Sequence, residues 1–135
     1  INGEFIGTDG RAYLYQHTET AYDVIFLDAF SSAHLIPEHL VTREFFELAR
    51  SRLAAHGLMV ANIIGLPFQA TGFFPNVLAT MEAVFGNCHQ ELSHFDPETP
   101  ANIMILCVNT QSTRDEKSAI YTDNLNRSGW DIALK

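Results

Sequence analysis

Basic residues are scarce in this chain of 135 residues: eight Lys and Arg stand against 16 Asp and Glu, which gives a formal net charge of −8. Binding to nucleic-acid phosphates depends on clustered Lys and Arg side chains, and here these residues are few and scattered. The composition therefore argues against a nucleic-acid partner. The acidic balance instead suits a cationic ligand.

Long apolar runs are also missing, although 47% of the residues are hydrophobic. A membrane helix needs roughly 20 consecutive apolar residues, and no run in this chain approaches that length, so we expect no membrane partner. The chain has only two cysteines, Cys88 and Cys107, both in apolar, strand-like surroundings. Free cysteine behaves as a small hydrophobe in such surroundings, so we expect free thiols, a reducing compartment and a cytoplasmic protein.

Several catalytic and metal-binding motifs have no counterpart here. The chain has no glycine-rich phosphate loop, and Ser31-Ser32 lacks the flanking glycines of a hydrolase nucleophile elbow. His34 and His39 are five residues apart, with no Cys or carboxylate at a recognised metal-ligand spacing. We therefore expect no metal site and no serine-hydrolase chemistry.

Strand-like and helix-like segments alternate along the chain, and its length is that of one domain. Strands are expected at 4–8, 22–30, 58–64, 89–93 and 103–108. Three helices are expected: one at 11–16, one that starts after an N-cap at Thr42 and stops at Gly57, and one at 74–85 that ends at Gly86. Residues 112–135 form a polar tail that can be partly helical. This order predicts an α/β fold with an open, mostly parallel sheet, helices on both faces and a closing antiparallel hairpin.

Ligands of such sheets bind beyond the carboxyl ends of the strands, where the chain places Asp9, Asp28 and Asn62. Asp28 closes a long apolar strand, where a partly desolvated carboxylate can accept a proton or hold a cation; alternatively it only caps the next loop. Asp9-Gly10 is a common turn pair that could also receive an adenine ring. For Asn62 we expect a structural role in its strand.

Three segments carry a resemblance to a known family: DGRAYL at 9–14, YDVIFLDAFS at 22–31 and IPEHLVTREFF at 36–46. They resemble the spermidine synthases, particularly the bacterial spermidine-synthase-like members. The likeness extends over 53–62, and YTDN at 121–124 is similar to the Thr-Asp-Asp segment that often closes these proteins. The family has the Rossmann-like fold of the AdoMet-dependent methyltransferases. It transfers an aminopropyl group from decarboxylated AdoMet to putrescine, releases methylthioadenosine and keeps no permanently bound cofactor.

The resemblance also implies roles for individual residues. Asp28 would be the catalytic carboxylate that helps to deprotonate the attacking amine. The nucleoside donor would be bound by Asp9, Gly10, Ala29, Phe30 and Pro37, and the polyamine by Asp28 and the position of Ser31.

Two departures from the family pattern shape the functional hypotheses. Polyamine-making members carry a second acid three positions after the catalytic Asp, where this chain has Ser31. The family's first two strands, with the glycine-rich turn and the acid that holds the ribose, precede the region of likeness. We therefore expect one partial domain, inactive in isolation and homo-oligomeric through an unpaired strand edge. An AdoMet-dependent methyltransferase-like protein and a non-catalytic binding relic of the fold are the alternatives.

Overall fold

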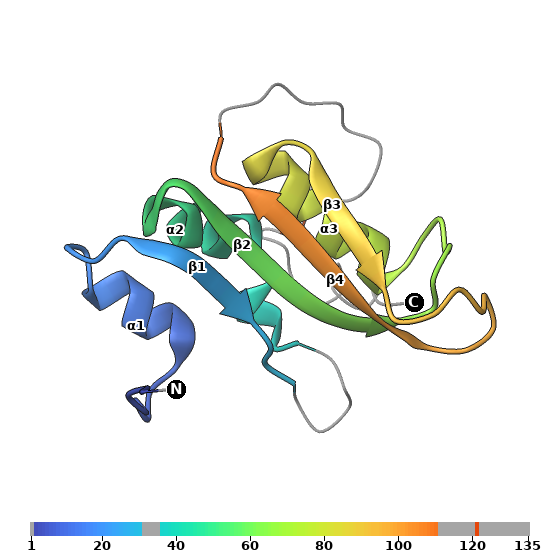
Figure 1. Ribbon diagram of the computed structural model, residues 1–135, viewed down its shortest axis with the longest axis horizontal. Helices are drawn as coiled ribbons and strands as arrows, with labels where there is room; N and C mark the ends of the chain where they lie inside the picture. The colour runs from blue at the N-terminus through green and yellow to red at the C-terminus, as the bar shows by residue number, and fades with distance from the viewer. Residues whose placement is uncertain (1, 31–35, 111–120, 122–135) are drawn as a thin grey trace.

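The computed structural model describes residues 2–30, 36–110 and 121 of the chain, and Figure 1 shows its elements. Apart from the short 3₁₀ turn η1 (Glu38–Leu40), the helices are α1 (Gly10–Gln16), α2 (Arg43–Ser51) and α3 (Phe73–Phe85), and the strands are β1 (Tyr22–Leu27), β2 (Leu53–Gly65), β3 (Cys88–Leu92) and β4 (Ala101–Val108). The predicted α/β alternation is confirmed.

The four described strands form one sheet in the order β1-β2-β4-β3. β1 pairs with β2 in parallel, whereas β2 with β4 and β3 with β4 are antiparallel. The closing hairpin of β3 and β4 is confirmed, but a mostly parallel sheet is only partly matched in the described residues. Parallel pairing is confined to the strands that a helix connects, since the hairpin folds back on itself.

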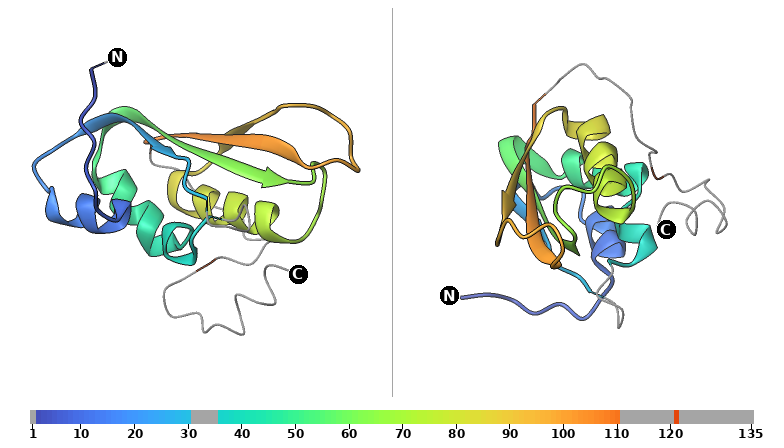
Figure 2. Two further views of the ribbon diagram at one scale, coloured as in Figure 1. Left: turned by 90° about the horizontal axis from the view of Figure 1, so that it is seen from below. Right: turned by 90° about the vertical axis from the view of Figure 1, so that its right-hand side faces the viewer.

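All helices of the described residues lie on one face of the sheet, as the two side views in Figure 2 show. The expectation of helices on both faces was therefore wrong for this part of the chain. The core lies between the sheet and α2 and α3, and its fully buried members include Phe46, Val77, Met81 and Ile103. None of the described helices is long and apolar enough to cross a membrane.

Local sequence accounts for the ends of the two core helices. The Thr42 hydroxyl accepts a hydrogen bond from the Phe45 N–H at 3.1 Å, so the predicted N-cap of α2 is confirmed. Gly86, with φ +90°, ends α3 in a conformation that favours glycine. α2, however, ends at Ser51 and not at Gly57, because the Arg52 carbonyl already accepts from the Tyr22 N–H at 2.8 Å.

Gly57 lies inside β2, where the parallel partner strand approaches closely. A Cβ at this position would be 3.0 Å from the carbonyl oxygens of both Ala54 and Tyr22. These are backbone atoms that cannot move aside cheaply, and the register between β1 and β2 shifts at this point. The glycine therefore serves strand pairing and not helix termination.

The amino-terminal segment differs from the prediction. Residues 4–8 form no strand, and the Phe5 side chain is 95% exposed. A strand needs a neighbour, and β1 pairs only with β2 among the described residues. Residues 4–8 therefore have no described strand to pair with, although their sequence is strand-like.

Of the predicted polar tail, 112–135, only Tyr121 lies within the described residues. Its side chain is completely buried, and its ring centroid lies 6.4 Å from that of Phe73 on α3. Its backbone joins both core helices: the carbonyl accepts from the Arg43 N–H at 2.7 Å, and the N–H donates to Thr80 Oγ1 at 3.1 Å. Burial raises the pKa of the Tyr121 phenol.

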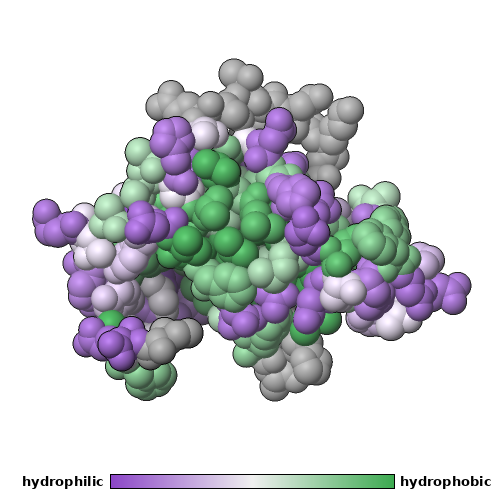
Figure 3. Space-filling model, viewed as in Figure 1, coloured by the Kyte–Doolittle hydropathy of each residue, from purple (hydrophilic) through white to green (hydrophobic). Residues whose placement is uncertain are grey.

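The helix-free face of the sheet is apolar. Side chains alternate along each strand, and those that point away from the core include Val24, Phe26 and Val108, which are 51%, 52% and 40% exposed. Figure 3 shows this face, with hydrophobic residues gathered over the strands. Exposed apolar areas of this kind are common where a protein contacts another chain or a ligand.

The expectation of free thiols was wrong, because Cys88 and Cys107 form a disulfide. The two residues are directly opposite each other in the antiparallel pairing of β3 and β4, with 4.5 Å between their Cα atoms. The spacing of 19 residues in the sequence conceals this proximity, which arises only when the hairpin register is fixed.

We predict that the disulfide contributes about 2–4 kcal/mol to the free energy of unfolding, because it lowers the conformational entropy of the unfolded chain. Under oxidising conditions, Cys88→Ser should unfold at lower denaturant concentration than the wild type. A reductant should lower the wild-type midpoint to that of the variant and leave the variant unchanged. A wild-type midpoint that does not respond to reductant would contradict this prediction.

Candidate functional site

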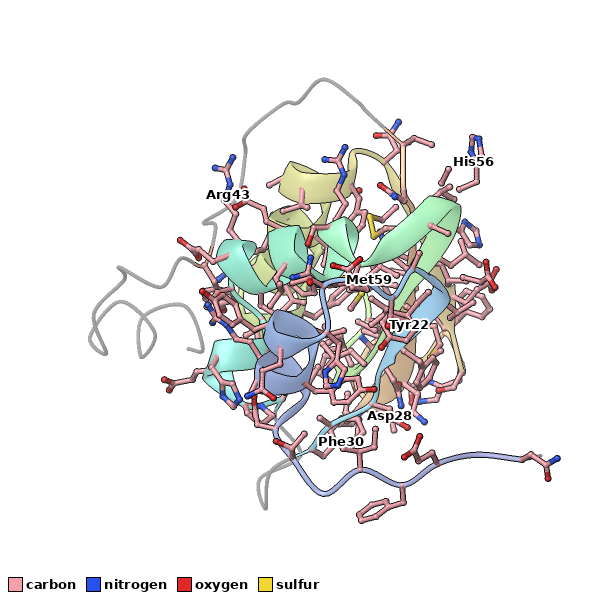
Figure 4. The ribbon with its side chains drawn as sticks, turned by 90° about the vertical axis from the view of Figure 1, so that its left-hand side faces the viewer. Tyr22, Asp28, Phe30, Arg43, His56 and Met59 are labelled. Carbon is pink, nitrogen blue, oxygen red and sulfur yellow. A yellow bond between two sulfur atoms is a disulfide. The ribbon has the colours of Figure 1, made fainter. Side chains whose placement is uncertain are left out.

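Asp28 follows directly after β1, and the parallel pairing brings it beside β2. Leu27 is the register partner of Ala61. Because the strands are parallel, the residues that follow them, Asp28 and Asn62, are neighbours as well. Asn62 Nδ2 donates to Asp28 Oδ1 at 3.0 Å. The Asp28 side chain is exposed to solvent, and Figure 4 shows it with Phe30 at one end of β1.

A cavity of about 550 Å³ opens beside this carboxylate. Its walls come from the segment before α1, from α1 itself, from β1 and the start of the following loop, and from Leu40 of η1 and Phe45 of α2. Three of the predicted site residues line it together: Gly10, Asp28 and Ala29. A Cβ at Gly10 would meet no atom within 4 Å, so the space in front of this backbone is open to a ligand.

The other predicted site residues are not part of this lining. Asp9 is the N-cap residue of α1, and Pro37 directly precedes η1. Phe30, the residue after Ala29, has a side chain that is 38% exposed. Ser31 lies outside the described residues. The structure thus gathers three of the seven predicted donor and amine residues around one cavity, and the roles of all seven stay predictions.

The charge of the cavity is negative. Among its described lining residues the charged ones are Glu4 and Asp28, both acidic. A cavity with acidic groups and apolar walls favours a cationic organic ligand. Within the described residues, no group of three His, Cys, Asp or Glu side chains is arranged to hold a metal ion.

The Asp9 carboxylate has a structural task. Oδ1 accepts from the Ala12 N–H at 3.0 Å and so caps α1, while Oδ2 is 2.5 Å from His39 Nε2. The hydrogen bond with His39, followed by that with the Ala12 N–H, lowers the pKa of Asp9. Both side chains are nearly half exposed, at 48% for His39 and 44% for Asp9.

Sequence reasoning missed His39 as a partner of Asp9, because 30 residues separate the two and no motif joins them. It also missed a pair of tyrosines, Tyr13 on α1 and Tyr22 on β1, which both line the cavity. The interaction with the Tyr22 hydroxyl raises the pKa of Tyr13. A phenol with a raised pKa stays protonated near neutral pH and can donate a hydrogen bond to a ligand.

Comparison with known proteins confirms the resemblance to the spermidine synthases. The chain is 38% identical over 90 residues to a polyamine aminopropyltransferase of Vibrio vulnificus, covering 66% of this chain and 27% of that protein. It is 34% identical over 89 residues to polyamine aminopropyltransferase 2 of Pseudomonas aeruginosa, covering 64% and 25%. The chain therefore spans about a quarter of the length of these relatives. No protein-family model matches it.

Solved structures agree on the fold. A probable spermidine synthase from Corynebacterium glutamicum matches with a TM-score of 0.62 and 27% identity, over 78% of this chain and 38% of that one. A spermidine synthase in complex with the transition-state analogue AdoDATO matches with a TM-score of 0.58 and 21% identity, over 79% and 34%. Human methyltransferase-like protein 13 in complex with SAH matches with a TM-score of 0.59 and 20% identity, over 93% and 53%. The fold is that of the spermidine synthases and methyltransferases.

We predict that Asp9 stabilises the fold in a pH-dependent way. Its lowered pKa means that the folded state favours the carboxylate, so the contribution is present above the ordinary value of 3.8 and is lost as the pH falls through the folded pKa. Asp9→Asn keeps an N-capping side chain and removes only the charge.

The gap in thermal midpoint between wild type and Asp9→Asn should be larger at about pH 7 than at about pH 3. Circular dichroism melts measure it. In a His39→Gln background the difference in thermal midpoint at the higher pH should be smaller. The substitution removes the hydrogen bond with His39, which is the largest cause of the lowered pKa of Asp9. An equal difference in thermal midpoint at both pH values would contradict a stabilising role of the Asp9 charge.

Proposed function

We propose that this chain provides part of the active site of an aminopropyltransferase that acts on decarboxylated AdoMet and a polyamine such as putrescine. One observation carries the proposal: Asp28 follows β1 at the edge of an acidic cavity that it shares with Gly10, in a fold matched by spermidine synthases. Since the chain spans only about a quarter of its curated relatives, the activity belongs to the full-length protein.

The chemistry explains why a carboxylate is needed there. An ammonium group has no lone pair, so the attacking amine must lose a proton before its nitrogen bonds to the aminopropyl carbon. The bond from that carbon to the sulfonium sulfur then breaks, and methylthioadenosine leaves as a neutral thioether. Asp28 takes the proton, and its negative charge stabilises the cationic donor before the transfer.

The donor side of the proposal rests on the open backbone at Gly10. The flat adenine ring can approach there, while Asp9 lies at its edge and Ala29, Phe30 and Pro37 complete the nucleoside site. The AdoDATO complex of a spermidine synthase supports decarboxylated AdoMet as the co-substrate. Methylthioadenosine as the product and the lack of a permanently bound cofactor are further parts of the proposal. The acidic lining supports a cationic donor and a cationic amine alike.

Methyl transfer from AdoMet is the second candidate, because Ser31 occupies the position of the family's second acid. Calorimetry on the full-length protein with decarboxylated AdoMet, AdoMet and methylthioadenosine separates the candidates. Preference for decarboxylated AdoMet supports aminopropyl transfer, preference for AdoMet supports methyl transfer, and binding of none of the three leaves a non-catalytic relic of the fold.

The expected cytoplasmic location stays a prediction, and the disulfide points to a different compartment. Disulfides are rare in reducing compartments, so the pairing of Cys88 with Cys107 favours an oxidising one. The response of the unfolding midpoint to reductant therefore bears on the compartment as well as on the fold.

Asp28→Asn in the full-length protein should lower turnover by roughly 100-fold or more, the range expected when a general base is lost. The amide preserves the shape of the side chain, so the thermal midpoint should change little. Release of methylthioadenosine, followed by chromatography, measures the rate. Asp23→Asn, at an exposed position on the same strand, is the matched control and should keep wild-type turnover. Unchanged turnover in Asp28→Asn would remove this residue from the mechanism.

The 135-residue chain alone should release no methylthioadenosine from decarboxylated AdoMet and putrescine beyond the uncatalysed rate, since half of the donor contacts are expected outside it. We also expect it to form homo-oligomers, because β1 pairs on one side only among the described strands and the helix-free face is apolar.

Light scattering on the same sample tests the association. Phe26→Lys, on the helix-free face, should shift the chain toward monomer, whereas Phe95→Lys, at a 74% exposed position in the β3–β4 loop, should not. Turnover well above the uncatalysed rate, or a monomeric wild-type chain, would show the respective part of the proposal to be wrong.

A further inference from the structure

Three polar contacts join the first turn of α1 to the segment that runs from η1 into α2. Oδ2 of Asp9, the N-cap residue of α1, is 2.5 Å from His39 Nε2. Arg11 Nη1 donates to the His39 carbonyl oxygen at 3.0 Å and to Thr42 Oγ1 at 3.4 Å. His39 is therefore held from α1 through its ring and through its backbone at once. We call these three contacts the α1–η1 clamp.

The chemistry of the groups fixes the direction of each contact. An ionised carboxylate can only accept hydrogen bonds, so His39 Nε2 carries the proton and donates it to Asp9. The lowered pKa of Asp9, of which His39 is the largest cause, agrees with an ionised carboxylate at this place. The Arg11 guanidinium is always charged and always a donor. Near neutral pH the clamp therefore has one stable pattern of donors and acceptors.

The clamp lies directly behind two walls of the cavity. Neither Asp9 nor His39 lines it, but the residue that follows each of them does: Gly10 on α1 and Leu40 in η1. The bond between Asp9 and His39 thus links the backbones from which two opposite parts of the lining start. A change in this bond alters the distance between these walls.

The Arg11 contact reaches a third part of the lining. Thr42 Oγ1, to which Arg11 donates, also accepts the N–H of Phe45 at 3.1 Å, and Phe45 lines the cavity. The Phe45 side chain is buried in the core, so its place is set by the backbone at the start of α2. The clamp therefore joins α1 to both segments that face it across the cavity.

The clamp fixes geometry and contributes little to global stability. The side chains of His39 and Asp9 are nearly half exposed, and exposed ion pairs stabilise proteins only slightly. Loss of the clamp should therefore leave the fold intact and act on the position of the first turn of α1. In the proposed function this turn carries Gly10, where the nucleoside donor approaches the backbone.

Building on the proposed function, we propose that His39 is a positioning residue for the nucleoside donor: it holds Gly10 on one wall of the cavity at a fixed distance from Leu40 on the other. His39 itself does not touch the donor. A preformed site binds more tightly than one that must be ordered on binding. The amine side is independent of this device, since the pairing of β1 with β2 sets the place of Asp28.

Kinetics on the full-length protein test this proposal. His39→Ala should raise KM for decarboxylated AdoMet, and weaken methylthioadenosine binding in calorimetry, by about 3- to 30-fold, the range for residues that act on a site without contacting its ligand. Values of kcat, KM for putrescine and the thermal midpoint should stay close to wild type. His89→Ala is the matched control, because it removes a histidine–carboxylate pair of the same length, with Glu91 on β3, and should change none of these values.

The same substitution in an Asp9→Ala background shows whether His39 acts through Asp9. If it does, His39→Ala should add little to the loss of donor affinity that Asp9→Ala causes, since residues that act as a unit are not additive. An equal loss in both backgrounds overturns the proposal. So does a fall in kcat and a rise in both KM values together with a lower thermal midpoint, because this is the signature of a folding defect.

Amide hydrogen exchange tests the clamp without any ligand. The N–H groups of Ala12 and Tyr13 donate to the Asp9 side chain and carbonyl oxygen. Their exchange should become faster in His39→Ala and stay unchanged in His89→Ala, because the first turn of α1 opens more often once its tie to η1 is lost. Unchanged exchange in His39→Ala overturns the proposal, whatever the ligand data show.

The two levels of the proposal fail in different ways. If the wild-type protein binds no methylthioadenosine, the donor side of the proposed function is wrong and the donor role of His39 falls with it. If the wild-type protein binds methylthioadenosine and His39→Ala binds it equally well, only the role of His39 is wrong and the proposed function stands.

Discussion

The parallel pairing of β1 with β2 is the constraint on which the rest of this molecule depends. It sets Leu27 opposite Ala61, and thereby places Asp28 next to Asn62 at the end where the cavity opens. It requires Gly57, because the β1 backbone leaves no room for a side chain there. It also makes β2 the inner strand that joins β1 to the antiparallel hairpin. A slip of one residue would turn the core residues of β2 outward and separate the carboxylate from its amide partner.

One face of the sheet carries the described helices, and the other carries the Asp28–Asn62 pair and the exposed apolar side chains. Met59, Ala61 and Ile63 of β2 belong to the core, whereas Asn62, between them, faces the other way toward Asp28. The half-exposed Val24 and Phe26 lie on this second face as well. Polar groups and uncovered apolar surface side by side are typical of a binding region that a further element of structure completes.

The sequence predicted the elements well where a local signal decides them. The Thr42 cap, the apolar stripe of α3 ending at Gly86, and the position of Asp28 after an apolar run are all local patterns, and they hold. The errors concern long-range relations. The cysteine pairing depends on hairpin register, and the Asp9–His39 contact joins residues 30 apart. Residues 4–8 have a strand-like sequence, but no partner among the described strands, and without a partner the pattern has no structural effect.

The buried position of Tyr121 bears on where this structural unit ends. The last described strand stops at Val108, and a boundary drawn from the sheet alone would fall there. Yet Tyr121 fills the space beside Phe73 and gives the first amide of α2 and the Thr80 hydroxyl of α3 their partners. A shortened form cut between the sheet and this residue would expose a hole between the two helices and leave a helix amino terminus unpaired. The packed core therefore includes Tyr121, although this residue lies outside the sheet.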